Sequence, residues 1–128
     1  MTGGESIPGP GYFFTPTVVC EVPADARLLR EELFGPIAPI QTFCSEPEAI
    51  DAANDTEHGL AAYVYTREHS RAMRVIDELQ CGMVALNKGT LSNAAAPFGG
   101  IKHSGYGCEG GAEGLAEYLE VKYVAMTR

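Results

Sequence analysis

The sequence contains no Cys-x-x-Cys pair, no long apolar run and no secretory leader. Its four cysteines are widely and unevenly spaced, and none of its three histidines lies near one at zinc-finger spacing. Structural zinc is therefore not expected, and the cysteines are expected to be reduced thiols. No apolar segment has the length of a membrane-spanning helix. The first residues, MTGGESIPGPG, have neither the basic region nor the apolar stretch of a signal peptide. These absences predict a cytoplasmic protein.

Positive charge is also scarce. The 128 residues include 9 Lys and Arg against 17 Asp and Glu, a formal net charge of −8. This balance argues against nucleic acid and anionic membranes as partners. Hydrophobic residues make up 45% and charged residues 20%, an ordinary globular composition. The length suits one domain with a real core.

Four segments have the composition of strands: residues 12–19, 37–43, 60–66 and 83–87. The third, LAAYVYT, is continuously apolar, as in strands buried on both faces.

Helices are expected between these strands and after the last. The first runs from an Asp25 cap to Glu31, and the second opens with a capping box of Ser45 and Glu48 and ends near Asn54. The third is expected over 67–80, with a Thr66 cap, a buried face of Met73, Ile76 and Leu79, and a terminating Gly82. A short fourth helix is possible over 111–117, and the alternating residues 118–126 predict a further strand that either pairs within the domain or offers an edge to a partner. This order predicts an α/β fold with right-handed crossovers and a mostly parallel sheet.

A glycine-rich stretch from Ser92 to Gly111 holds six of the fifteen glycines. Loops of this length are usually functional or disordered. Phe98 and Ile101 lie inside it, which favours a packed, shaped loop over a flexible linker. Gly105-x-Gly107-x-x-Gly110 formally matches a dinucleotide fingerprint, but no strand precedes it and too few residues follow it.

Two other features could carry chemistry. Glu31 and Glu32 precede a Phe-Gly-Pro break that could expose them in a cleft, although paired acids are more often a solvated helix face. Cys44 lies near a helix N-terminus and Cys81 near a helix C-terminus, where the dipole disfavours a thiolate. No base can be placed beside either thiol, so structural cysteines are favoured.

The strings EELFGPIAPI, ANDTEHGLAAYVYT, GMVALNKG, APFGGIKHSGYG and EYLEVKY resemble, in this order, the C-terminal part of an NAD(P)-dependent aldehyde dehydrogenase. The resemblance covers nearly the whole chain, and its finer match is to the succinate-semialdehyde dehydrogenases. It implies an oxidoreductase that converts an aldehyde, expected to be succinate semialdehyde, to its carboxylate. It divides the chain into part of the catalytic domain, residues 1–117 with a substrate loop at 92–111, and an oligomerisation strand, residues 118–128.

The resemblance also assigns roles to four residues. Glu32 matches the glutamate that hydrogen-bonds the nicotinamide ribose of NAD or NADP, and Phe34 matches the aromatic beside the nicotinamide. Ser92 matches the serine that holds the distal carboxylate of succinate semialdehyde, and Phe98 belongs to the loop that borders the substrate tunnel. The terminal strand implies a homo-oligomer.

Two departures from the family pattern stand out. Cys108 occupies a position where the family usually has arginine. The family's nucleophilic cysteine, general base and dinucleotide-binding domain all precede the region matched here. We therefore expect no catalytic residue within the chain, which alone would be inactive. Two alternatives stay open: an assembly module that pairs with full-length subunits, and one half of a split enzyme.

Overall fold

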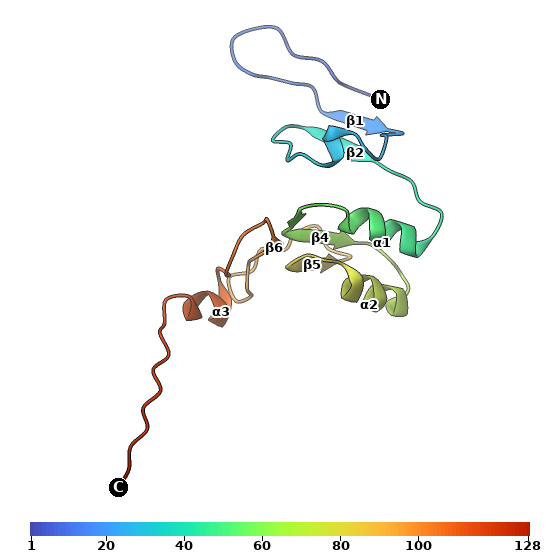
Figure 1. Cartoon of the computed structure of the whole chain (residues 1–128). Helices are drawn as coiled ribbons and strands as arrows, with labels where there is room; N and C mark the ends of the chain where they lie inside the picture. The colour runs from blue at the N-terminus through green and yellow to red at the C-terminus, as the bar shows by residue number, and fades with distance from the viewer. The chain divides into compact units, whose positions relative to one another are not determined.

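The computed structural model describes residues 1–128, which divide into two compact units, Met1–Ala49 and Ile50–Arg128. Figure 1 shows the elements in chain order. No helix is long and apolar enough to cross a membrane. Each unit contains a pair of parallel strands, which agrees with the predicted α/β class.

The first unit is built on strands β1 (Thr17–Cys20) and β2 (Ile37–Ile40), which pair in parallel with Thr17 opposite Ile37. Isolated bridges at Thr2–Val18 and Ser6–Phe14 fold the otherwise irregular first residues back along the chain. The predicted helix at Asp25 is reduced to the single 3₁₀ turn η1 (Arg27–Leu29). Asp25 does not cap it, because the capping position is Ala26 and carries no side-chain bond.

The predicted capping box forms at the start of α1 (Glu46–Asn54), with one change. The Ser45 hydroxyl accepts the Glu48 N–H at 3.3 Å, as expected. The Glu48 carboxylate reaches back one residue further than predicted and accepts the Cys44 N–H at 2.7 Å. The Glu48 N–H is one of the first donors of the helix, which lack partners within it, so its bond to Ser45 explains why the helix begins here.

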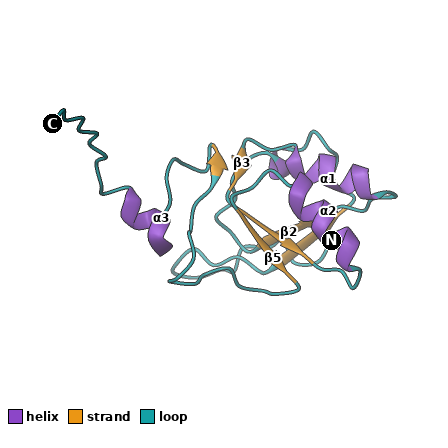
Figure 2. Cartoon of the chain, turned by 90° about the horizontal axis from the view of Figure 1, so that it is seen from below, coloured by secondary structure: helices purple, strands orange, loops and turns teal.

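The second unit contains the predicted strand–helix–strand crossover. Strand β4 (Ala61–Val64) leads through α2 (His69–Glu78) to β5 (Met83–Leu86), and the strands pair in parallel with Ala61 opposite Met83. Ala72 of α2 and Ala85 of β5 are buried. Figure 2 shows α2 and β5 in a second view. The helical spacing of apolar residues in 67–80 thus located α2, and the apolar segments 60–66 and 83–87 located β4 and β5.

Three details of this crossover differ from expectation. The β4 strand is not buried on both faces, because Ala62 and Val64 are half-buried while the Tyr63 side chain is 52% exposed. Met73 is 53% exposed, and the inward face of α2 is formed instead by Ala72 with half-buried Val75, Ile76 and Leu79. Neither predicted end of α2 is correct, because its N-cap is Glu68 and not Thr66, and its C-cap is Leu79, before Gly82.

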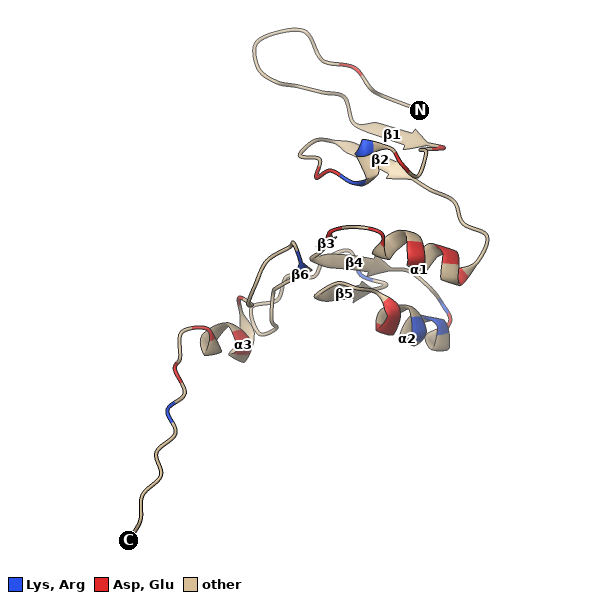
Figure 3. Cartoon of the chain, in the orientation of Figure 1, with Lys and Arg blue, Asp and Glu red and all other residues tan.

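The glycine-rich loop carries a short strand, β6 (Ile101–Lys102), which pairs antiparallel with β3 (His58–Gly59). Helix α3 (Gly111–Ala116) follows, close to the predicted position. The last residues extend away from α3 without pairing with any strand of the chain (Figure 1). Positions of Asp and Glu, coloured red, mark α1, α3 and the last turn of α2, while Lys and Arg positions, coloured blue, mark the first turns of α2 (Figure 3).

Candidate functional site

The two acidic residues before the Phe-Gly-Pro break have different surroundings. Arg27 donates to Glu31 through two bonds, Nε to Oε1 at 2.7 Å and Nη2 to Oε2 at 3.0 Å. These bonds hold the pKa of the Glu31 carboxyl below its usual range and raise the pKa of Arg27. The Glu31 carboxylate is therefore engaged within its own turn.

Glu32, by contrast, is exposed and forms no hydrogen bond within the chain. Phe34, two residues on, is 95% exposed. The Gly35 carbonyl accepts the Ile37 N–H at 2.8 Å in a tight turn, after which β2 begins. A free carboxylate and an uncovered aromatic ring thus lie within three residues of one loop. A carboxylate can accept hydrogen bonds from hydroxyl donors, and an exposed flat ring can pack against another flat apolar group.

The glycine-rich loop is a shaped element and not a flexible linker. Phe98 and Glu109 exchange two backbone hydrogen bonds, at 2.7 and 2.8 Å. The loop also passes so close to Gly82 that a β-carbon there would overlap the Gly99 carbonyl. This close approach explains the glycine that the sequence pattern had assigned to the end of α2.

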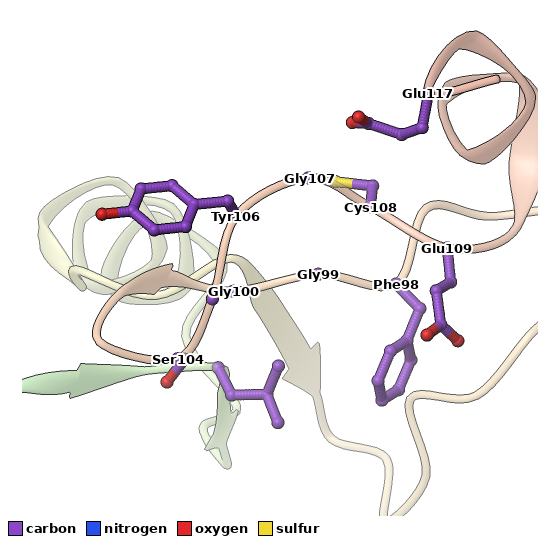
Figure 4. A pocket seen from close by; sticks show the side chains of 11 residues that line it. Phe98, Gly99, Gly100, Ser104, Tyr106, Gly107, Cys108, Glu109 and Glu117 are labelled. Carbon is purple, nitrogen blue, oxygen red and sulfur yellow. The ribbon is translucent and has the colours of Figure 1, made fainter.

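The loop encloses a hollow of about 440 Å³. Figure 4 shows Phe98 and Glu109 along one side of it, the Glu117 carboxylate directed toward Gly107, and the Tyr106 ring pointing away. Phe98 is 41% exposed, so part of its ring is available to a ligand. The loop therefore offers an apolar surface with carboxylates at its margin.

Ser92 is exposed and does not line this hollow. It lies in the segment that leaves the carboxyl end of β5. Downstream of it, the Asn93 side chain accepts the Ala95 N–H at 3.0 Å and the Asn93 carbonyl accepts the Ala96 N–H at 3.1 Å. The Ser92 hydroxyl makes no hydrogen bond within the chain and is free to bind a ligand.

Asn87 joins the ends of two neighbouring strands, a contact that the sequence analysis did not predict. Its side chain accepts the Thr66 N–H at 3.0 Å and donates to the Thr66 carbonyl at 2.8 Å, which joins the carboxyl ends of β4 and β5. Its φ of 51° redirects the chain toward Ser92. The signal was an asparagine directly after a buried strand, since Asn adopts the left-handed region more readily than most residues.

The four cysteines are all free thiols. Cys81 donates to the Met83 carbonyl at 3.3 Å, and Cys108 lines the hollow beside Gly99. No group of three or more His, Cys, Asp or Glu side chains gathers in a metal-binding arrangement.

The four predicted binding residues fall into two pairs. Glu32 and Phe34 lie together in the first unit, and Ser92 and Phe98 lie on one connected segment of the second. Glu32, Phe34 and Ser92 are exposed, and Phe98 is 41% exposed, so part of each side chain is accessible. Each is therefore free to contact a ligand.

Comparison with known proteins gives a consistent result. The profile described as "Aldehyde dehydrogenase family" matches residues 1–124. A succinate-semialdehyde dehydrogenase of Paenarthrobacter nicotinovorans is 52% identical over 126 residues, covering 98% of this chain and 28% of that protein. One from Escherichia coli K12, whose name specifies NADP+, is 50% identical over 126 residues, covering 98% and 26%.

A solved structure agrees with these relatives. The crystal structure of succinate-semialdehyde dehydrogenase from Burkholderia pseudomallei superimposes with a TM-score of 0.90 at 48% identity, covering 97% of this chain and 26% of that one. The chain thus spans about a quarter of the length of the relatives it matches.

Proposed function

Because this chain belongs to the aldehyde dehydrogenase family, we propose that it forms the C-terminal quarter of an enzyme that oxidises succinate semialdehyde to succinate with NAD+ or NADP+. The observation that carries the proposal is the 52% identity, over nearly the whole chain, to a protein named for that substrate. In this account the nucleophilic cysteine, the general base and the dinucleotide-binding domain come from residues outside the chain.

The first contribution of the chain is to hold the nicotinamide end of the cofactor. The Glu32 carboxylate accepts hydrogen bonds from the ribose hydroxyls, while Phe34 packs beside the ring and fixes its orientation. Bound NAD(P)+ supplies the acceptor for the hydride that leaves the aldehyde carbon. The Arg27–Glu31 pair supports this assignment, because it leaves Glu32 as the uncommitted acid of the two.

The second contribution is to bind the substrate. Succinate semialdehyde has an aldehyde at one end and a carboxylate at the other, joined by two methylene groups. The Ser92 hydroxyl donates to the distal carboxylate, and the partly exposed Phe98 ring contacts the methylene groups. The aldehyde end is thereby held at a fixed distance from Ser92, toward the nucleophile.

A second candidate function rests on the last residues. From Glu120 onward the chain is extended and unpaired, with Val121 and Tyr123 almost fully exposed (Figure 1). An unpaired extended segment can add to the sheet of a second subunit, which would make the enzyme a homo-oligomer. If the chain occurs by itself, this segment makes it an assembly module that pairs with full-length subunits.

The proposal is tested with the protein as it occurs in its cell. Its mass, measured by blotting with an antibody to residues 92–111, is expected to be several times the 13.6 kDa of this chain. The purified complete protein is expected to form NADH or NADPH when given succinate semialdehyde, and residues 1–128 alone are expected to form none. Turnover by residues 1–128 that depends on one of their cysteines would contradict the proposal.

A further inference from the structure

The glycine-rich loop is attached to the end of α1 through one lysine. The Lys102 ammonium donates to the Asn54 carbonyl at 3.0 Å and to the Thr56 carbonyl at 3.1 Å, and both bonds are partly buried. Asn54 is the last residue of α1, where the helix leaves carbonyl groups without helical partners and the dipole favours a cation. The ammonium therefore satisfies these carbonyls as a C-terminal cap would.

Asn54 extends the connection to α2. Its side-chain amide donates to the Glu78 carbonyl, at the end of α2, at 2.9 Å, and its side-chain oxygen accepts the Gln80 N–H at 2.8 Å. One asparagine thus joins the ends of two helices through its side chain while its own carbonyl receives the lysine.

The backbone of the loop at this point is held in an unfavourable conformation. Lys102 has a φ of 55°, in the left-handed region that non-glycine residues seldom adopt. Neighbouring contacts keep it there: His103 N–H donates to the Glu57 carbonyl at 2.9 Å, and Gly59 N–H donates to the Ser104 hydroxyl at 2.8 Å. A strained residue that is this well surrounded by contacts commonly positions a functional segment.

We propose that Lys102 and Asn54 form a clasp that fixes the glycine-rich loop to the ends of α1 and α2, and that Lys102 is a positioning residue for substrate binding. The clasp itself follows from the hydrogen bonds, whereas its effect on the substrate rests on the proposed function. When the ammonium is removed, the loop is expected to open and close more often, so that Phe98 is less often in its binding position.

The test compares two variants in the complete protein. Lys102→Asn removes the ammonium but tolerates the left-handed backbone, and Lys102→Arg keeps a cation and its donors. Lys88→Met, a change at an exposed lysine, is the control for amide exchange. Exchange is followed at the Phe98 and Glu109 amides, which report on the loop, and at the Asn87 amide, which bonds to Val64 in the neighbouring strand pair.

We expect Lys102→Asn to speed exchange at Phe98 and Glu109 about tenfold, the loss expected for charge-assisted hydrogen bonds, with Asn87 unchanged. The KM of Lys102→Asn for succinate semialdehyde should rise several-fold with little change in kcat. Lys102→Arg should have loop exchange rates and a KM close to those of the unchanged protein. Unchanged loop exchange would overturn the clasp. Equal acceleration at Asn87 would overturn it too, because Lys102 would then hold the whole fold. A wild-type protein without activity on the aldehyde defeats the proposed function only, since exchange still decides the clasp.

Discussion

The guanidinium of Arg27 binds both carboxylate oxygens of Glu31, at 2.7 and 3.0 Å, and leaves the adjacent Glu32 without a partner. Two neighbouring acids with the same chemistry are thereby given different roles. Glu31 stabilises its own turn, and Glu32 is free for a ligand.

This difference predicts opposite outcomes for two matched substitutions. Glu32→Gln in the complete protein should raise the KM for NAD(P)+ by about tenfold or more, since a charge-assisted bond to the ribose is weakened. Glu31→Gln should leave that KM within about twofold. Steady-state kinetics with varied cofactor measure both. An equal rise in the KM for NAD(P)+ in the two variants would show that cofactor binding depends on the conformation of the turn and not on the free carboxylate of Glu32.

The Arg27–Glu31 pair also predicts a dependence on pH. Because the pKa of Glu31 is lowered in the folded state, its contribution to stability is present above the unfolded pKa and is lost as the pH falls through the folded pKa. Arg27→Met should therefore reduce the protection of residues 27–31 from amide exchange at neutral pH and not in acid. A loss of protection that is the same at both pH values would count against the pair.

Phe34 is predicted to matter for activity and not for stability. Its side chain is 95% exposed, so Phe34→Ala removes almost no packing within the chain. The melting temperature should stay nearly constant while kcat falls, because the nicotinamide loses the surface that orients it. Phe43→Ala, a change at another exposed phenylalanine, is the control. A fall in melting temperature that accounts for the lost activity would contradict the assigned role.

Ser92→Ala should impair only substrates with a distal carboxylate. The KM for succinate semialdehyde is expected to rise about tenfold, whereas that for butanal, which has no carboxylate, should not change. Ser70→Ala, in α2, serves as the control. If Ser92→Ala raises the KM for both aldehydes by the same factor, Ser92 supports the loop and does not bind the carboxylate.

Gly82 and Gly89 form a matched pair for stability. A β-carbon at Gly82 would overlap the Gly99 carbonyl, which is backbone and cannot rotate away, so Gly82→Ala should cost about 1–3 kcal/mol of unfolding free energy. At Gly89 the nearest atom would be the Tyr65 hydroxyl at 3.8 Å, an ordinary contact. Chemical denaturation of the two variants measures the difference, and equal stability would show that the loop shifts to make room.

Sequence reasoning succeeded where one local rule determined the outcome. Ser45 and Glu48 located the start of α1, and the apolar segments located β4 and β5. It failed at Asp25, where the capping position is the next residue, Ala26, and at Gly82, whose glycine is required by the close approach of the Gly99 backbone. It also failed at Tyr63 and Met73, because a strand or helix pattern indicates that a face is apolar and not that anything within the chain covers it.

The candidate site was predictable only in part. Composition marked the loop at 92–111 and the break after Glu32, but the individual roles came from the family resemblance. Asn87 and Lys102 were missed because their importance lies in backbone groups that they bind at distant positions, Thr66 and Asn54. No periodic pattern encodes such contacts.

The most direct test of the account replaces the matching quarter of the Escherichia coli relative with residues 1–128 and measures oxidation of succinate semialdehyde. The 50% identity of the two segments makes a folded chimera feasible. The account predicts turnover with NADP+ that falls when Glu32→Gln or Ser92→Ala is introduced into the chimera. A folded chimera that binds NADP+ but does not oxidise the aldehyde, or one indifferent to both changes, would contradict the claim that this chain supplies the cofactor and substrate contacts.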